Sequence, residues 1–112
     1  MNKIVHIAKE DVIFDPESVG KMLTSVMRRK HSCTLAGCCE VESTLIVSFE
    51  PALEAPHYTI VLSPVKGEGA DEVSAAISTR SASGFILRGS FHVGEEELWG
   101  LFEYHKDEGK NG

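Results

Sequence analysis

Two stretches of the chain alternate between apolar and polar residues in the manner of paired β-strands. Residues 83–105 are expected to form two strands joined by a tight acidic turn, and residues 32–50 show the same design earlier in the chain. Because every second residue of a strand shares one face, the alternation predicts which side chains point into the core. The predicted inner faces carry Cys33, Leu35, Gly37, Cys39 and Val41, then Leu45, Val47 and Phe49, then Phe85, Leu87, Gly89, Phe91 and Val93, and finally Leu98, Gly100, Phe102 and Tyr104.

Each pair of strands is preceded by one further predicted strand and one predicted helix. Residues 3–8 and 57–63 are short apolar runs that indicate strands. Asp15 and Pro16 mark the start of the first helix, since aspartate caps free N–H groups and proline suits the first helical position. A shorter helix opens at Asp71 and ends at Gly84. The helical residues expected to be buried are Val19, Met22, Leu23, Val26 and Met27 on the first helix and Val73, Ala76 and Ile77 on the second.

The two halves match each other at a nearly constant separation in sequence. Leu35 lies 52 positions before Leu87, and Leu45 lies 53 positions before Leu98. We therefore predict a single α+β domain, 1–105, built from two βαββ repeats at 1–50 and 57–105, with a connector at 51–56 and a flexible tail at 106–112. The six strands are expected to form a largely antiparallel sheet with both helices on one face. The strand order, and the choice between an open sheet and a barrel, stay undetermined at this stage.

The second half also resembles a known family. After the helix, Gly84, Phe85, Ile86 and Leu87 precede an acidic turn and an aromatic final strand. In this respect residues 75–105 resemble the short bacterial βαββ domains of unknown function, which carry a glycine–tryptophan–glutamate–leucine signature after the helix. Phe85 stands at the tryptophan position of that signature and Ile86 at the glutamate position. The resemblance implies a βαββ fold and brings no assigned activity.

Composition and charge narrow the classes of function. A chain of 112 residues with 42% hydrophobic and 25% charged residues is typical of one soluble globular domain. The net charge of −6 repels phosphate backbones, and the end of the first helix explains the basic run at 28–30, so we expect no nucleic-acid partner. The sequence shows no apolar run as long as a membrane-spanning helix and no secretory signal pattern, so we expect no membrane partner. Three cysteines within seven positions favour a reducing, cytoplasmic setting over a disulfide framework.

A cysteine-rich stretch is the first candidate for chemistry. His31, Cys33, Cys38 and Cys39 lie within nine positions, but zinc sites usually pair two closely spaced cysteines with a second such pair. Neighbouring Cys38 and Cys39 also point to opposite faces of a strand, and the inward Cys33 and Cys39 suit hydrophobic packing. An outward Cys38 has no base or positive charge beside it on its face to make it a nucleophile. The sequence therefore predicts no metal site and no cofactor.

The helix-free face of the predicted sheet is the second candidate. It carries four of the five histidines and the only tryptophan among apolar residues, a mixture that commonly marks an association or ligand site. The principal interpretation is an interaction or ligand-binding module that forms a homo-oligomer through sheet-to-sheet or edge pairing. The candidate binding and interface residues are Trp99, Arg88, His92, Leu101, Ile86 and Glu103.

Other uses of the same face stay open. One is a small-molecule pocket bordered by Trp99, Arg88 and His92, and another is ordinary solvated surface. A third is a small enzyme in which Arg88 holds an anion, His92 acts as base and Glu103 orients it. Arg88 and His92 would lie about 13 Å apart on one strand, so a group from a neighbouring strand would have to join them. No catalytic residue is therefore assigned.

Overall fold

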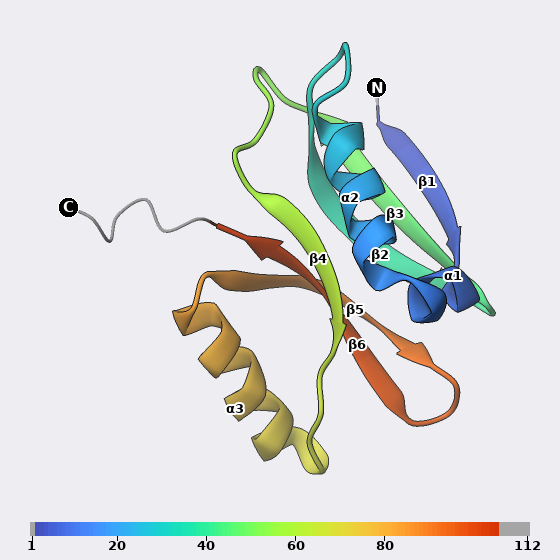
Figure 1. Cartoon of the computed structure of the whole chain (residues 1–112), viewed down its shortest axis with the longest axis vertical. Helices are drawn as coiled ribbons and strands as arrows, with labels where there is room; N and C mark the ends of the chain where they lie inside the picture. Colours follow the sequence, from blue (N-terminus) through green and yellow to red (C-terminus); the bar gives the residue numbers. More distant parts are fainter. Residues whose placement is uncertain (1, 106–112) are drawn as a thin grey trace.

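The computed structural model describes residues 2–105 as two small antiparallel sheets with three helices (Figure 1). The elements in chain order are β1 (Lys3–Ala8), α1 (Lys9–Phe14), α2 (Pro16–Met27), β2 (Cys33–Val41), β3 (Thr44–Pro51), β4 (Thr59–Pro64), α3 (Gly69–Ala82), β5 (Phe85–Val93) and β6 (Glu97–Tyr104). The α+β class and the six strands are confirmed. The tail expected at 106–112 lies outside the described residues.

The six strands form two three-stranded sheets, which corrects the expectation of one continuous sheet. Sheet A has the order β1-β3-β2 and sheet B the order β4-β6-β5, and every pairing is antiparallel. The edge strands β2 and β5 lie against each other, but no strand pairing joins them among residues 2–105. Instead, the Cys38 thiol reaches the carbonyl of Ser90, and the Glu40 carboxylate accepts the N–H of His92. Side chains thus provide these polar contacts between the two sheets.

Each sheet contains a β-bulge at a corresponding place. The strand register shifts between Leu35 and Gly37 in β2 and between Leu87 and Gly89 in β5. A bulge sets two residues of one strand against one of its partner, so the alternation of side chains reverses beyond it. Strict alternation therefore predicts the wrong face for the second half of both strands.

The reversal changes which side chains enter the core. Before the bulge in β5, Leu87 lies opposite Phe102; beyond it, Phe91 lies opposite Trp99, with the two rings stacked at 6.2 Å. Phe102 and Trp99 point to opposite faces of β6 because they are three residues apart. In β2 the half-buried Cys38 packs against the core and its neighbour in sequence is exposed, so the predicted orientations of these two cysteines are wrong.

The first predicted helix is confirmed as α2. The Asp15 carboxylate caps it, accepting the N–H of Ser18 at 3.2 Å and the Ser18 hydroxyl at 2.7 Å. Four of the five residues in its predicted apolar stripe are buried, while Met22 is 36% exposed. The sequence pattern did not predict the six-residue α1, which continues directly from β1 and buries Val12.

The second predicted helix, α3, is less deeply buried than expected. None of its residues is fully buried, and the three positions predicted to enter the core are half-buried. Arg80 anchors the helix to sheet B. Its guanidinium lies 5.1 Å from the centroid of the Phe102 ring and donates to the Ser63 hydroxyl at 2.9 Å and the Pro64 carbonyl at 2.7 Å.

One buried cluster joins α2 to both sheets. It includes Leu23 and Met27 of α2, Val47 of β3 and Leu101 of β6. Figure 1 shows α2 between β4 and the strands of sheet A, whereas α3 lies on the other side of β4, away from sheet A. The two helices therefore do not cover a common sheet, and the side of sheet B opposite Phe102 faces the shared core.

Candidate functional site

The face predicted as the working surface is largely buried at its centre. Three of its six candidate residues are core or near-core positions: Trp99 at 6% exposure, Leu101 at 0% and Glu103 at 3%. Of the others, Ile86 is half-buried, and Arg88 and His92 are exposed. The burial arises because this side of sheet B packs against α2 and sheet A. The centre of this face is therefore not accessible to a ligand or partner in this fold.

A buried carboxylate organises the polar residues at the end of β6. Oε1 of Glu103 lies 3.0 Å from Nε of Arg88 and 3.0 Å from Nε2 of His105. The Glu103 side chain is only 4% exposed, whereas about half of the Arg88 side chain is exposed. A buried charge requires pairing and hydrogen bonds. Nε of Arg88 is thus paired with Glu103, the carboxylate that the enzyme interpretation assigned to orienting His92.

Tyr58 connects this carboxylate to sheet A. Its ring stacks on His105 with centroids 5.1 Å apart, and its hydroxyl lies 2.8 Å from Oγ1 of Thr34 and accepts the N–H of Leu35 at 3.1 Å. Burial raises the pKa of Tyr58, and the negative charge of Glu103 acts in the same direction. The phenol therefore stays neutral. Through these contacts Tyr58 joins β2 to the ends of β4 and β6, which is a structural role.

His92 belongs to a different cluster, centred on Glu40. The Glu40 carboxylate accepts the backbone N–H of His92 at 3.1 Å, lies 3.2 Å from its Nδ1, and forms an ion pair with Nζ of Lys9. The hydrogen bond from Lys9 is the main cause that lowers the pKa of Glu40 to about 2, and the backbone and ring of His92 contribute further. The structure thus pairs His92 with Glu40 and Arg88 with Glu103. Residues predicted to act together have separate partners.

The cysteine-rich stretch shows no arrangement for chemistry. Within residues 2–105 no three His, Cys, Asp or Glu side chains gather as a metal-binding group. All three cysteines are free: Cys33 is buried, Cys38 half-buried and Cys39 exposed. Burial raises the pKa of Cys38, and the adjacent Cys39 acts in the same direction. A thiol with a raised pKa is a poor nucleophile at neutral pH, so the structure favours packing for Cys38.

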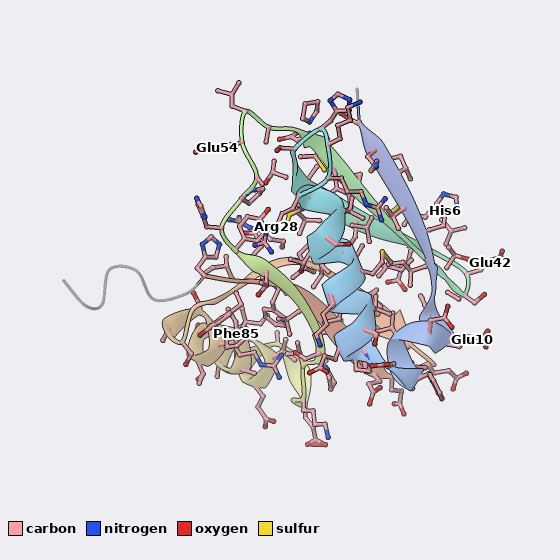
Figure 2. All side chains as sticks on the ribbon, turned by 45° about the horizontal axis from the view of Figure 1, so that its top comes forward. His6, Glu10, Arg28, Glu42, Glu54 and Phe85 are labelled. Atoms are coloured by element: carbon pink, nitrogen blue, oxygen red, sulfur yellow. The ribbon has the colours of Figure 1, made fainter. Side chains whose placement is uncertain are left out.

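The outer edge of β1 is an exposed feature that the sequence reasoning missed. The bond from the N–H of Lys9 to the carbonyl of Ser43 continues the β1–β3 ladder, which places the odd-numbered residues of β1 in hydrogen-bonding positions toward β3. In an antiparallel pair the intervening residues direct their N–H and C=O groups away from the partner. Ile4 and His6 therefore present these groups outward. Ile4 is 52% exposed, and Figure 2 shows His6 on the outside of β1.

The helix-free face of sheet A borders this edge. The register places Ile4 opposite Ser48 and His6 opposite Ile46, and all four side chains share this face. Ser48 and Ile46 are half-buried, and Val41 at the far end of β2 is 51% exposed. Sheet A therefore offers a mixed apolar and polar surface that continues to an open strand edge.

The outer edge of β4, which has the same place in sheet B, is covered by α2. Oγ1 of Thr24 accepts the N–H of Ile60 at 2.9 Å, and Arg28 donates to the carbonyl of Tyr58 at 2.9 Å. Figure 2 shows Arg28 between α2 and the segment that leads into β4. Gly20 allows the close approach, because a Cβ at this position would lie 2.6 Å from the carbonyl oxygen of Ile60.

A groove of about 810 Å³ runs between α2 and β4. This size lies within the range of roughly 300–1,000 Å³ that is usual for ligand sites. Polar and charged side chains of α2 form one wall, and residues 59–62 of β4 form the other. Sequence reasoning missed this groove because it depends on α2 lying beside β4, a contact that no local pattern encodes.

Together, these features describe a small α+β protein with two antiparallel sheets, an open strand edge at β1 and a groove between α2 and β4. No helix in the described part of the chain is both long and apolar enough to cross a membrane. Comparisons with protein-family models, curated proteins and solved structures find no match for this chain. The resemblance to the bacterial βαββ domains accordingly stays a prediction.

Proposed function

We propose that this protein is an interaction module that self-associates through its sheet, by antiparallel pairing of β1 with β1 of a second copy. The observation that carries the proposal is the outward N–H and C=O groups of Ile4 and His6 on a six-residue edge strand. Unpaired backbone groups at a sheet edge are a template for pairing with another strand. Pairing would join two copies of sheet A into one six-stranded sheet and cover part of the exposed Ile4 side chain.

The edge of β4, which α2 partly covers, supports this choice of edge. There, Thr24 of α2 bonds the outward N–H of Ile60, and Arg28, the C-cap residue of α2, bonds the carbonyl of Tyr58 just before β4. On β1, no side chain in the described part of the chain bonds the outward groups of Ile4 and His6. Of the two corresponding edges, the one on sheet A therefore offers more unpaired backbone groups to a second copy.

A duplicated origin of the chain also supports the proposal, and we infer two βαββ repeats. Both sheets place their third strand in the centre, and both bulges occur at positions 52 apart in sequence. Equivalent positions also meet at the junction, since Cys38 contacts Ser90 and Glu40 contacts His92, again 52 apart. In a protein built from two similar units, α2 of the first unit packs on the β4 edge of the second unit. The corresponding β1 edge of the first unit has no such cover in the described part of the chain, which suggests that a second copy would bind there.

We also infer a cytoplasmic setting, which three unpaired cysteines in a chain of 112 residues support. The net charge of −6 supports a protein partner over a nucleic acid. The sequence resemblance to βαββ domains is compatible with this proposal and adds no activity to it.

Sedimentation of the wild type and two variants at position 6 tests the proposal. His6→Pro removes the outward N–H and leaves the bonds to β3, because proline is tolerated at an edge position whose N–H faces solvent. We expect self-association of the wild type, weakened about tenfold or more by His6→Pro, since tenfold corresponds to roughly 1.4 kcal/mol, the scale of one or two hydrogen bonds. His6→Ala removes the imidazole and keeps the N–H, so it should weaken association much less.

Two outcomes would contradict edge pairing. One is a wild-type chain that stays monomeric at about millimolar concentration, where even an association of −4 kcal/mol is detected. The other is an equal weakening of self-association by His6→Pro and His6→Ala, which would show that the imidazole of His6, and not its backbone N–H, makes the contact. Circular dichroism of each variant checks that the fold is retained.

A further inference from the structure

The groove between α2 and β4 has a fixed shape. Gly20 brings the helix backbone against the carbonyl of Ile60, and the bond from the Ile60 N–H to Thr24 holds this contact. At the other end, the Arg28 guanidinium donates to the carbonyls of Tyr58 and Pro56 at 2.9 and 3.4 Å. The walls are therefore held by direct bonds, so a ligand would bind without first ordering them.

One backbone position in the groove is open for pairing. The bond from the N–H of Val65 to the carbonyl of Leu98 and the β4–β6 register direct the even-numbered residues of β4 outward. Of these, Ile60 bonds Thr24, and Pro64 has no N–H and gives its carbonyl to Arg80. Leu62 lies between them and lines the groove. Its outward N–H and C=O have the geometry that an extended peptide residue needs for two hydrogen bonds.

The wall formed by α2 is positively charged. Residues 18–39 carry four lysines and arginines and no carboxylate, in a chain whose net charge is −6. Two of these cations, Lys21 and Arg28, line the groove. Lys21 lies on α2, and Arg28 is the C-cap residue seven positions further along, or about 10 Å along the helix axis. Three residues of an extended strand span the same distance, at about 3.3 Å each. Glu17 is the only acidic residue of the lining, and its contact with Lys21 at 3.8 Å is highly exposed.

We propose that this groove binds an extended acidic peptide segment of a partner protein. The segment forms two backbone hydrogen bonds with Leu62 and directs carboxylates toward Lys21 and Arg28. Short strand addition of this kind takes its affinity from backbone bonds and its specificity from the flanking side chains. The site lies on β4 and is independent of the β1 edge, so the two proposals can fail separately.

The test is an NMR titration of the ¹⁵N-labelled protein with a synthetic peptide of alternating valine and glutamate. We expect the Leu62 amide to shift and to exchange more slowly with solvent when the peptide binds. Lys21→Glu, at an exposed position, should weaken binding about tenfold by reversing one charge of the groove wall. The matched control is Lys66→Glu, which makes the same charge change at an exposed position outside the groove lining and should leave the affinity within about twofold.

Several results would overturn the proposal. A Leu62 amide that is unaffected by the peptide would exclude pairing at β4, and shifts confined to β1 amides would assign peptide binding to the other edge. If Lys66→Glu lowers the peptide affinity as much as Lys21→Glu does, or if a valine–lysine peptide binds as tightly as the valine–glutamate peptide, the groove does not select acidic segments. Repeating the titration in His6→Pro separates this proposal from self-association, because peptide binding should persist there.

Discussion

Glu40 and His92 lie 52 positions apart in the sequence, and the carboxylate of Glu40 accepts the backbone N–H of His92 at 3.1 Å. The same carboxylate forms an ion pair with Lys9, the first residue of α1. One side chain of sheet A therefore contacts both sheet B and α1. Because no strand pairing joins the sheets among the described residues, this carboxylate is a principal polar contact between them.

Glu40→Gln should destabilise the protein by about 1 kcal/mol, since charge-assisted hydrogen bonds are lost at a site about one-third exposed. Urea unfolding measures the effect. Glu54→Gln, in the exposed connector, is the matched control and should change the free energy of unfolding by less than about 0.5 kcal/mol. Equal effects of the two substitutions would contradict a specific role for Glu40.

Acid should remove this contribution. The pKa of Glu40 in the fold is about 2, against an ordinary value of 4.5. A carboxylate whose pKa is lowered by folding stabilises the protein above its unfolded pKa and loses that effect as pH falls toward the folded value. The difference in unfolding free energy between wild type and Glu40→Gln should therefore shrink between pH 4.5 and 2. A difference that stays constant over this window would be inconsistent with ionised Glu40 as its source.

Gly20→Ala tests the contact between α2 and β4. Alanine in a helix is ordinarily more favourable than glycine, but here the new Cβ would lie 2.6 Å from the Ile60 carbonyl oxygen. We expect destabilisation of about 1–3 kcal/mol, because the helix must move away from the strand. Gly37→Ala is the control, since a Cβ at Gly37 meets no atom within 4 Å. A neutral or stabilising Gly20→Ala would contradict the close approach.

A double-mutant cycle tests the pair formed by Arg88 and Glu103. Arg88→Ala and Glu103→Gln, singly and together, should give a coupling of about 1 kcal/mol, because Glu103 is buried while the exposure of Arg88 reduces the effect. The pair Glu17 and Lys21 is the matched control. Its side chains are 82% and 78% exposed, so a coupling of at most about 0.5 kcal/mol is expected. If the coupling of Arg88 and Glu103 is no larger than that of the control pair, the buried carboxylate is not stabilised by this arginine.

Thiol labelling tests the bulge in β2. Cys39 is exposed and should be alkylated first, Cys38 should react more slowly because it is half-buried and its pKa is raised, and Cys33 should react only on unfolding. Mass spectrometry of the labelled peptides measures the order. Strict alternation predicts the reverse order for Cys38 and Cys39, so faster labelling of Cys38 would contradict the bulge.

The sequence predicted the elements that depend on local pattern. The strand runs and the stripe of α2 follow from apolar residues at regular spacing, and Asp15 with Pro16 located the start of that helix. The bulges were missed because one extra residue, Ala36 or Arg88, leaves no mark in composition. Beyond each bulge the inferred faces of β2 and β5 were therefore reversed. Trp99 lies on β6, which has no bulge; it was expected on a surface because no local pattern shows that its side of sheet B packs against α2 and sheet A.

The candidate site was harder to predict because it depends on which strands are neighbours. Arg88 and Glu103 were both singled out and do form a pair. His92 was assigned to the same group, yet its partner Glu40 comes from the other sheet, and nothing in the local sequence fixes that contact. The open edge of β1 and the groove beside β4 likewise follow from strand order and from the position of α2.

The burial of Trp99 also makes the protein its own optical probe. This residue is the only tryptophan, it stacks on Phe91, and its indole N–H donates to Glu97 at 2.7 Å. Since its ring lies on the side of sheet B that faces the shared core, its fluorescence should report the separation of the two sheets without any attached dye.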